Sequence, residues 1–254
     1  MRHASEAAAS AITPKERSII ALDVPTAEAA REIVAELRDV VGAFKIGLQL
    51  FTAAGPSFVR ELTSAGVKIF LDLKFHDIPN TVAMASVEAA RLGVWMFNVH
   101  AGGGGEMMRR TVDEVRSVCK GAGVPVPKMI AVTVLTSSDR ATLFETGVGD
   151  EVADQVARLA RLAADSGMDG VVASSFEVAT IRDVVSSEGF LIVTPGIRPI
   201  AATSDDQKRV TTFARAIASG SDYVVIGRPV TQAVDRREAV RQMLAETDQT
   251  LNDL

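Results

Sequence analysis

Short apolar runs rich in β-branched residues alternate eight times with longer stretches of helical periodicity along this chain. The expected strands cover residues 18–22, 43–46, 67–73, 96–99, 128–134, 170–173, 191–194 and 223–226. The expected helices cover residues 26–37, 56–64, 81–91, 105–120, 152–165, 176–185, 211–218 and 236–246. Eight β/α units in 254 residues match the repeat number and length of a closed parallel barrel, so the pattern predicts an α/β protein with a single-domain (β/α)8 TIM barrel. An open, doubly wound parallel sheet is the alternative architecture.

The segment before the first expected strand differs in composition from the rest of the chain. Residues 1–17 combine small residues with charges of both signs and contain no apolar core, so we expect a loose N-terminal tail rather than a signal peptide. No linker rich in Pro, Gly or Ser divides residues 18–254, which we assign to one catalytic barrel domain.

Charge and cysteine content narrow the class of protein. A net charge of −5 gives no basic surface for nucleic acid, and no apolar run reaches the ~18 residues that a membrane span needs. Cys119 is the only cysteine, so a disulfide framework cannot form. We therefore expect a soluble, cytoplasmic protein that binds neither nucleic acid nor membrane.

Polar or turn-forming residues follow the expected strands at their C-terminal ends, the face on which barrels of this kind build active sites. These residues are Asp23, Lys45, Asp72, Lys74, His100, Thr136, Ser174, Pro195, Gly196, Arg198, Gly227 and Arg228. Some of them merely begin loops. That explanation fails for Lys45 and Lys74, because a charge at an inward strand position is costly unless it is paired.

The motif DLKFHDIP at residues 72–79 is the strongest candidate for a chemical centre. Asp72 and Lys74 are two residues apart, so in a strand their side chains point to the same face. Asp77 follows in the turn that Pro79 helps to shape. The motif therefore places a cation between two anions.

Five motifs in chain order carry a resemblance to a known enzyme family. They are ALD at residues 21–23, FKIG at 44–47, DLKFHDIP at 72–79, VTPGIR at 193–198 and VIGRP at 225–229. The D-x-K-x-x-D pattern alone also occurs in related sugar-phosphate barrels. In this combination, the chain from about residue 18 to about residue 245 resembles the bacterial-type orotidine 5'-monophosphate decarboxylases.

The resemblance implies an activity, an assembly and a set of site residues. The activity is conversion of orotidine 5'-monophosphate to uridine 5'-monophosphate in de novo pyrimidine biosynthesis, without a cofactor, by a homodimeric carbon–carbon lyase. The implied catalytic residues are Lys45, Asp72, Lys74 and Asp77, of which Asp77 would enter the partner subunit's site. The implied substrate-binding residues are these four and Asp23, Ile78, Thr81, Thr136, Arg198, Gln207, Gly227 and Arg228.

Parts of the nucleotide are assigned to different residues by the same resemblance. Asp23 and Lys45 would hold the ribose hydroxyls, and Thr136 would face the pyrimidine. Arg228 would bind the 5'-phosphate together with Gln207 and the loop that contains Arg198. The loops at 136–149 and 199–207 are longer than simple connections, as expected of covers over a ligand.

The chemistry of decarboxylation explains why a cation should lie between two anions. Loss of carbon dioxide from C6 of the pyrimidine leaves an electron pair that no neighbouring carbonyl group delocalises. An ammonium group beside C6 stabilises that pair and then protonates it, so we assign Lys74 as the general acid. Asp72 and Asp77 would hold Lys74 in place and keep it protonated.

Two other functions fit parts of the pattern. The pair Asp72 and Asp77 could hold magnesium, as in a keto-sugar-phosphate aldolase or decarboxylase of a related barrel family. Lys74 between them already supplies the positive charge, so we expect no metal. A non-catalytic barrel that binds a phosphometabolite is the second alternative, and the complete charged set argues against it.

Overall fold

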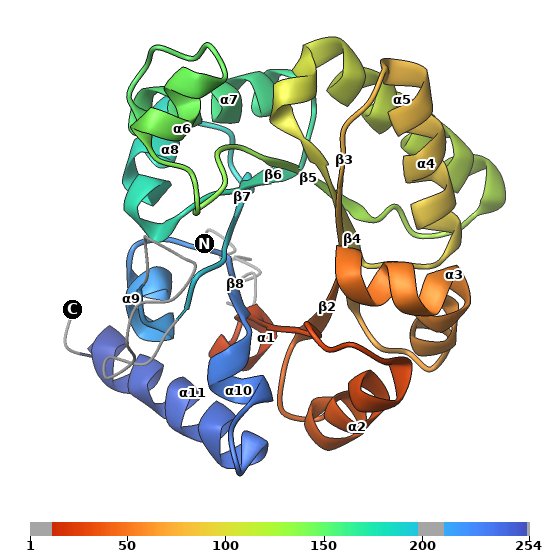
Figure 1. The fold of residues 1–254 in the computed structure, drawn as a ribbon, viewed down its shortest axis with the longest axis vertical. Helices are drawn as coiled ribbons and strands as arrows, with labels where there is room; N and C mark the ends of the chain where they lie inside the picture. The colour runs from red at the N-terminus through yellow and green to blue at the C-terminus, as the bar shows by residue number, and fades with distance from the viewer. Residues whose placement is uncertain (1–11, 198–210, 253–254) are drawn as a thin grey trace, which may run out of the picture.

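Eight parallel strands close into a barrel in chain order, and β8 completes the ring by pairing with β1 (Figure 1). The computed structural model describes residues 12–197 and 211–252. The predicted (β/α)8 TIM barrel is confirmed, and the doubly wound alternative is wrong. The strands are β1 (Ser18–Ala21), β2 (Ala43–Gly47), β3 (Ile69–Phe75), β4 (Met96–His100), β5 (Lys128–Val132), β6 (Gly170–Val172), β7 (Leu191–Thr194) and β8 (Tyr223–Ile226).

Helices surround the ring of strands on its outer side, as Figure 1 shows. The helices of the eight β/α units are α2 (Ala27–Leu37), α3 (Leu48–Ser64), α4 (Pro79–Arg91), α5 (Gly104–Ala122), α7 (Val152–Asp165), α8 (Val178–Val184), α9 (Phe213–Ala218) and α11 (Arg236–Asn252). The additional helical segments are α1 (Pro14–Arg17), α6 (Arg140–Glu145), α10 (Arg228–Thr231) and the 3-10 turns η1 (Ala101–Gly103) and η2 (Ser175–Glu177). Within the described ranges, none of these helices is long and apolar enough to cross a membrane.

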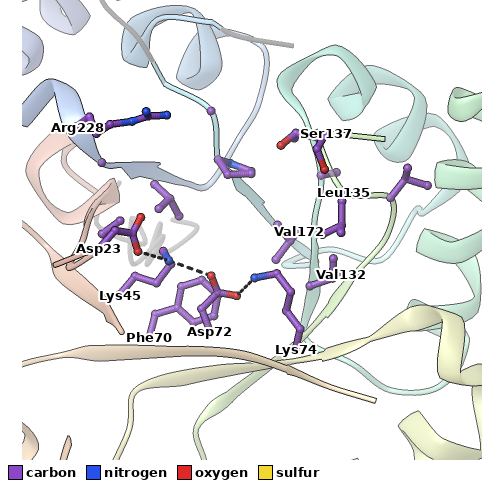
Figure 2. Close-up of a pocket in the computed structure, with 18 of the residues that line it drawn as sticks. Asp23, Lys45, Phe70, Asp72, Lys74, Val132, Leu135, Ser137, Val172 and Arg228 are labelled. Atoms are coloured by element: carbon purple, nitrogen blue, oxygen red, sulfur yellow. Dashed lines mark hydrogen bonds and ion pairs between the residues drawn. The ribbon is translucent and has the colours of Figure 1, made fainter. Parts of the chain in front are cut away.

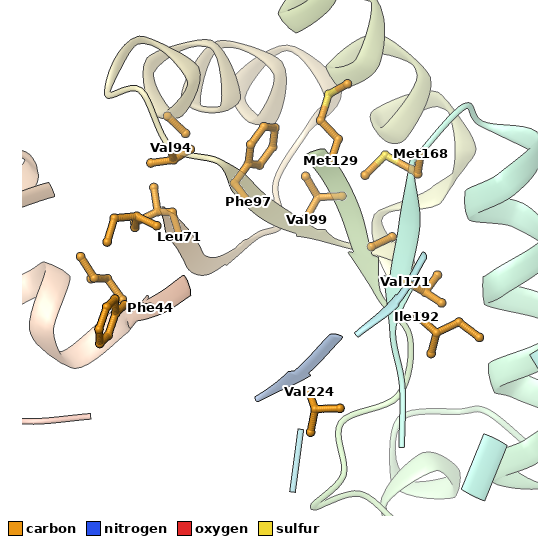
Figure 3. Close-up of a cluster of buried hydrophobic side chains, with 14 of the residues drawn as sticks. Phe44, Leu71, Val94, Phe97, Val99, Met129, Met168, Val171, Ile192 and Val224 are labelled. Carbon is orange, nitrogen blue, oxygen red and sulfur yellow. The ribbon is translucent and has the colours of Figure 1, made fainter. Parts of the chain in front are cut away.

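Alternation along the strands separates two hydrophobic cores. Residues such as Ile19, Phe70 and Met96 form the smaller core inside the barrel. The residues between the inward positions pack outward against the helices and form the larger core, part of which Figure 3 draws around Phe97 and Ile192. Because faces alternate along a strand, the inward row that contains Phe70 continues to residues 72 and 74 at the C-terminal end of β3.

After the first strand, three α-helical segments lie where the sequence pattern predicts none. α3 begins at Leu48 rather than at residue 56, and it kinks at Gly55, whose φ is 70°. The Gly55-Pro56 pair is typical of a helix start, so the sequence pattern gives no sign of the helical turns at residues 48–54. α6 lies inside the loop expected at 136–149, where Asp139 caps it by accepting a hydrogen bond from the backbone nitrogen of Thr142 at 3.0 Å. α10 follows β8 directly.

The last residues of the expected tail form α1 and are attached to the barrel. Thr13 and Glu16 form a reciprocal capping box around this helix. Arg17 donates to the carbonyl oxygen of Ser221 at 3.1 Å. A side chain at Gly42 would collide with the backbone of Glu16, so glycine allows this close approach. The prediction of a loose tail is therefore wrong for residues 13–17, and residues 1–11 lie outside the described part of the chain.

An aspartate immediately before β6 ties three elements together at the N-terminal end of the barrel. The Asp169 carboxylate accepts a hydrogen bond from the backbone nitrogen of Met129 in β5 at 2.7 Å. It also accepts from Arg116 of α5 at 3.4 Å, and Arg116 donates to the carbonyl oxygen of Gly167 at 3.1 Å.

The same arrangement recurs two units later, before β8. The Asp222 carboxylate accepts from the backbone nitrogen of Ile192 in β7 and from Arg182 of α8, both at 2.7 Å. Arg182 also donates to the carbonyl oxygen of Gly220 at 2.9 Å. These two aspartate–arginine clamps connect neighbouring strands to the outer helices, on the face opposite the expected site.

Two aromatic rings meet across the N-terminal end of the barrel. Trp95, directly before β4, packs edge-on against Tyr223, the first residue of β8, with ring centroids 5.1 Å apart. In an eight-stranded ring β4 and β8 are opposite each other, so this contact spans the barrel.

Candidate active site

The C-terminal end of the barrel contains a cavity of about 510 Å³ (Figure 2). Residues at the ends of seven of the eight strands line it. The polar and turn-forming lining residues are Asp23, Lys45, Asp72, Lys74, Thr136, Ser137, Pro195, Gly196, Gly227, Arg228 and Gln232. The apolar lining residues are Ala21, Phe70, Val132, Val134, Leu135, Val172, Ala173 and Val225.

A row of alternating charges crosses the floor of this cavity (Figure 2). The Lys45 ammonium lies 3.3 Å from Oδ1 of Asp23 and 3.0 Å from Oδ2 of Asp72. The Lys74 ammonium lies 2.7 Å from Oδ1 of Asp72. Parallel register brings these groups together, because Ala21 pairs with Lys45 and Gly47 pairs with Asp72 on neighbouring strands.

Burial increases toward the middle of the charged row. The side chains of Lys45 and Asp72 are each 11% exposed, whereas those of Lys74 and Asp23 are 31% and 59% exposed. Burial would lower the pKa of Lys45, but the Asp72 and Asp23 carboxylates outweigh it and raise that pKa. Burial would raise the pKa of Asp72, but the charges of Lys45 and Lys74, with hydrogen bonds from Lys74 and Asn98, hold it at about 2. Lys45 and Asp72, the two central groups of the row, are therefore both charged at neutral pH.

The backbone at Lys74 has an unusual conformation. Its φ is 50°, and among the described residues it is the only non-glycine residue with a positive φ. The β3–β4 register shifts between Leu71 and Phe75, on either side of it. The backbone nitrogen of Lys74 donates to Oδ1 of Asn98 at 2.8 Å, and Nδ2 of that amide donates to Oδ1 of Asp72 at 2.7 Å.

The two ends of the cavity differ in character. In Figure 2, Val132 and Val172 lie on the side of Lys74, so an apolar wall borders this end of the cavity. Arg228 lies at the opposite end, beyond Asp23, where it begins α10 directly after Gly227. A ligand with an anionic group at one end and a reacting carbon at the other would fit this polarity.

The structure brings most of the predicted site residues together. Asp23, Lys45, Asp72, Lys74, Thr136, Gly227 and Arg228 all line the cavity. Asp77, Ile78 and Thr81 do not line it; they are exposed at the start of α4. Arg198 and Gln207 lie outside the described residues.

Two polar residues at strand ends turn out to begin turns. His100 accepts a hydrogen bond from the backbone nitrogen of Gly102 at 3.3 Å, and its ring stacks on that of His76 with centroids 5.2 Å apart. Burial, together with the charges of His76 and Lys74, lowers the pKa of His100. Ser174 caps η2, where its hydroxyl accepts from the backbone nitrogen of Phe176.

Sequence reasoning missed Asn98, Ser137, Gln232 and the apolar wall. Asn98 is 1% exposed and stands at an inward position of β4 between Met96 and His100. A buried polar side chain in an apolar strand is the same signal that identifies Lys45 and Lys74, and it would have found this residue. Ser137 and Gln232 carry no comparable signal, because both lie in segments where polar residues are ordinary.

Comparison with known proteins gives a consistent result. The chain matches the Orotidine 5'-phosphate decarboxylase / HUMPS family over residues 16–243. It is 52% identical over 232 residues to the orotidine 5'-phosphate decarboxylase of Geobacter metallireducens, and this alignment covers 91% of this chain and 96% of that protein. The protein of the same name from Moorella thermoacetica is 49% identical over 235 residues, with 92% of this chain and 93% of that protein covered.

A solved structure agrees with these sequence relatives. The crystal structure of orotidine 5'-phosphate decarboxylase from Lactobacillus acidophilus matches this fold with a TM-score of 0.77 and 39% sequence identity, covering 91% of this chain and 98% of that chain. The family match spans most of the chain, and the relatives align over nearly their whole length. The chain therefore belongs to the Orotidine 5'-phosphate decarboxylase / HUMPS family.

Proposed function

We propose that this chain decarboxylates orotidine 5'-monophosphate to uridine 5'-monophosphate, a step of pyrimidine biosynthesis, without a cofactor. The observation that carries the proposal is the charged row, in which the Lys74 ammonium lies 2.7 Å from the Asp72 carboxylate on the floor of the cavity. Family membership and relatives of about half-identical sequence support the same reaction.

In this mechanism Lys74 performs the proton transfer. The bond between C6 and the carboxyl carbon breaks, carbon dioxide leaves, and the electron pair stays on C6. The adjacent ammonium stabilises that pair as it develops and then transfers one proton from Nζ to C6. Lys74 is left as a neutral amine, which takes a proton back from solvent after product release.

Asp72 and the apolar wall both favour loss of the carboxylate. Two like charges ~4 Å apart repel by roughly 4 kcal/mol at an effective dielectric near 20, so a substrate carboxylate beside Asp72 is under electrostatic stress that ends when carbon dioxide departs. Val132 and Val172 provide surroundings that suit neutral carbon dioxide better than a carboxylate. Together with Lys74, these contacts distinguish the transition state from the bound substrate.

The other end of the cavity suits the phosphoribosyl group. The Arg228 guanidinium can bind a phosphate through paired hydrogen bonds, and Asp23 with Lys45 offers an acceptor and a donor for ribose hydroxyls. Thr136 and Ser137 can hydrogen-bond the pyrimidine edge. Arg198 and Gln207 complete the proposed phosphate contacts. Binding energy from these remote groups positions the base at Lys74.

The active form in this proposal is a homodimer in which Asp77 serves the partner subunit's site. Within one chain Asp77 is exposed, and its Oδ1 accepts a hydrogen bond from the backbone nitrogen of Ile78 at 2.7 Å. Ile78 is 67% exposed, so its large apolar side chain is available for contact with a second copy. A second copy packed on the start of α4 would bury Ile78 and Thr81 and bring Asp77 toward another Lys74. The cytoplasmic location expected from the sequence stays a prediction.

The direct test is an absorbance assay with purified, chelator-treated protein and orotidine 5'-monophosphate. We expect the substrate absorbance to fall, with release of one carbon dioxide for each uridine 5'-monophosphate formed. Unchanged absorbance with correctly folded protein would overturn the proposal. Activity that returned only on adding magnesium would instead favour the related keto-sugar-phosphate enzymes, and nucleotide binding without turnover would favour a binding protein.

A further inference from the structure

We propose that Asn98 is a positioning residue that fixes the Asp72 carboxylate and the Lys74 backbone relative to each other. This inference rests on the proposed function, because it concerns the geometry of the ammonium group that would protonate C6. It adds a residue of β4 to the charged row, whose members lie on β2 and β3 and directly after β1.

The amide of Asn98 bridges two groups with opposite hydrogen-bonding needs. The backbone nitrogen of Lys74 can only donate, and it contacts Oδ1 of Asn98 at 2.8 Å. An ionised Asp72 carboxylate can only accept, and its Oδ1 lies 2.7 Å from Nδ2 of Asn98. These requirements fix the orientation of the amide without ambiguity. Asparagine supplies the donor and the acceptor at one side-chain length, whereas aspartate lacks the donor and leucine lacks both.

Burial makes both hydrogen bonds obligatory. Asn98 is 1% exposed, so water cannot replace either partner. An amide at an inward strand position would be unfavourable if its polar atoms were left unsatisfied. An apolar side chain would suit this inward position better unless the two hydrogen bonds of Asn98 are needed to hold Asp72 and Lys74.

The two contacts hold the site in two ways. Oδ1 of Asp72 receives Asn98 and the Lys74 ammonium together, and this directs Oδ2 toward Lys45 at 3.0 Å. The bond to the Lys74 backbone nitrogen holds a residue whose φ of 50° is unfavourable for lysine. Without that bond the Lys74 backbone can relax, and the origin of its side chain shifts relative to Asp72.

The test compares Asn98→Leu, which keeps the side-chain shape and removes both hydrogen bonds, with Asn98→Asp, which keeps only the acceptor. Val99→Ala is the matched control, because Val99 is the next residue of β4, is fully buried and faces the outer core. Wild type and Lys74→Ala are assayed in the same series. Thermal melting establishes that each variant is folded, and titration with uridine 5'-monophosphate gives the fraction of chains that bind nucleotide.

We expect Asn98→Leu to lower kcat for each nucleotide-binding chain by roughly ten- to a hundredfold, as for loss of a buried hydrogen bond to a charged group. KM should change by less than about threefold, because the phosphate and ribose contacts come from other strands. Val99→Ala should lower the melting temperature and leave kcat within about twofold of wild type.

Asn98→Asp gives a readout that loss of stability alone would not produce. The variant places a second carboxylate beside Asp72, the carboxylate that Lys45 and Lys74 contact. Repulsion between the two carboxylates favours protonation, so the acid limb of the kcat profile should shift to higher pH. This variant keeps the side-chain size, so it remains informative if Asn98→Leu does not fold.

The outcomes separate this inference from the proposed function. An inactive wild type would overturn the function. Suppose instead that wild type is active and Lys74→Ala is inactive. If the Asn98 variants then keep the wild-type kcat and an unshifted acid limb, only the positioning assignment is overturned.

Discussion

At the centre of the cavity one carboxylate, that of Asp72, contacts two ammonium groups and one amide. Either oxygen of Asp72 would be unfavourable to bury without a partner, so the carboxylate, the two lysines and the amide are stable only as a connected network. The reacting group in the proposed mechanism, Lys74, is the more exposed of the two lysines. The buried half of the row therefore holds the exposed half in place.

Replacing Lys74 with alanine removes the proposed proton donor. We expect Lys74→Ala to lower kcat by about a thousandfold or more, since general-acid and electrostatic stabilisation are lost together. Lys68→Ala, an exposed lysine just before the same strand, is the matched control and should keep wild-type kcat. Steady-state assays on folded protein decide the point, and near-normal turnover in Lys74→Ala would refute the assignment.

Asp72 makes stability depend on pH. Its pKa is about 2 in the folded chain against an ordinary value of 3.8, so below about pH 4 the unfolded chain binds more protons and stability falls with falling pH. We expect the free energy of unfolding of wild type, relative to Asp72→Asn, to fall by about 1 kcal/mol between pH 6 and pH 3. Urea unfolding at several pH values measures this difference. A pH-independent difference would show that Asp72 keeps its ordinary pKa.

At the residue level, the sequence correctly predicted which charged side chains point into the barrel, because one residue type at one position was enough. Lys45, Asp72 and Lys74 are charges at inward strand positions, and that is visible without coordinates. The bond from Asn98 to the Lys74 backbone depends on a register shift between β3 and β4, which strand periodicity does not encode. The apolar wall was missed because valines in strands are expected everywhere in a barrel.

At the level of elements, the barrel separates stabilising features from functional ones. The clamps of Asp169 and Asp222 lie before β6 and β8, at the N-terminal ends of strands, whereas the charged row lies at the C-terminal ends. Changes at one end should therefore leave the other largely unaffected.

Asp222→Ala tests this separation. It leaves the backbone nitrogen of Ile192 without its acceptor and removes the carboxylate from Arg182, which keeps its bond to the carbonyl oxygen of Gly220. We therefore expect a loss of about 1–3 kcal/mol in the free energy of unfolding with little change in kcat. The control is Glu88→Ala, which removes only the exposed ion pair with Arg91 and should cost at most about 0.5 kcal/mol. Equal losses in the two variants would contradict the clamp.

α10 places Arg228 at the end of the cavity opposite Lys74, so its effect should depend on the substrate phosphate. We expect Arg228→Ala to lower kcat/KM for orotidine 5'-monophosphate by roughly ten- to a hundredfold and to leave the slow turnover of orotidine, which has no phosphate, nearly unchanged. Arg241→Ala, an arginine paired with Glu238 on α11, serves as the control. Equal losses on both substrates would show that Arg228 does not serve the phosphate.

Periodicity located the strands within a few residues because burial on both sides of a parallel strand leaves a clear apolar run. It failed at segments whose structure depends on local geometry. The kink at Gly55 divides α3 into two helical pieces, of which only the second was predicted, and α6 is a short helix inside a polar loop. Neither the first piece of α3 nor α6 is long enough to show an apolar stripe of helical period.

At the scale of the whole molecule, the barrel followed from counting units, since eight repeats in a chain of this length leave few other arrangements. The assembly did not follow from the same reasoning. The exposed start of α4, with Asp77 and Ile78, is what one chain shows of the proposed interface.

Mixing two inactive variants tests whether sites are shared. In a dimer of Lys74→Ala and Asp77→Ala chains, one site has its own Lys74 and receives a normal Asp77 from the partner, while the other site has both lesions. Random exchange of equal amounts makes about half of the dimers mixed, so activity should return to roughly a quarter of wild type. Exchange is verified by mass. Full exchange without recovered activity would mean that Asp77 serves the site of its own chain.

The contact between Trp95 and Tyr223 gives the protein an internal optical probe. The chain contains one tryptophan and one tyrosine, and they meet across the N-terminal end of the barrel, away from the cavity. Tryptophan fluorescence should therefore respond when β4 separates from β8 and stay nearly constant when nucleotide binds at the other end. Ring opening can then be followed in the presence of substrate without a label.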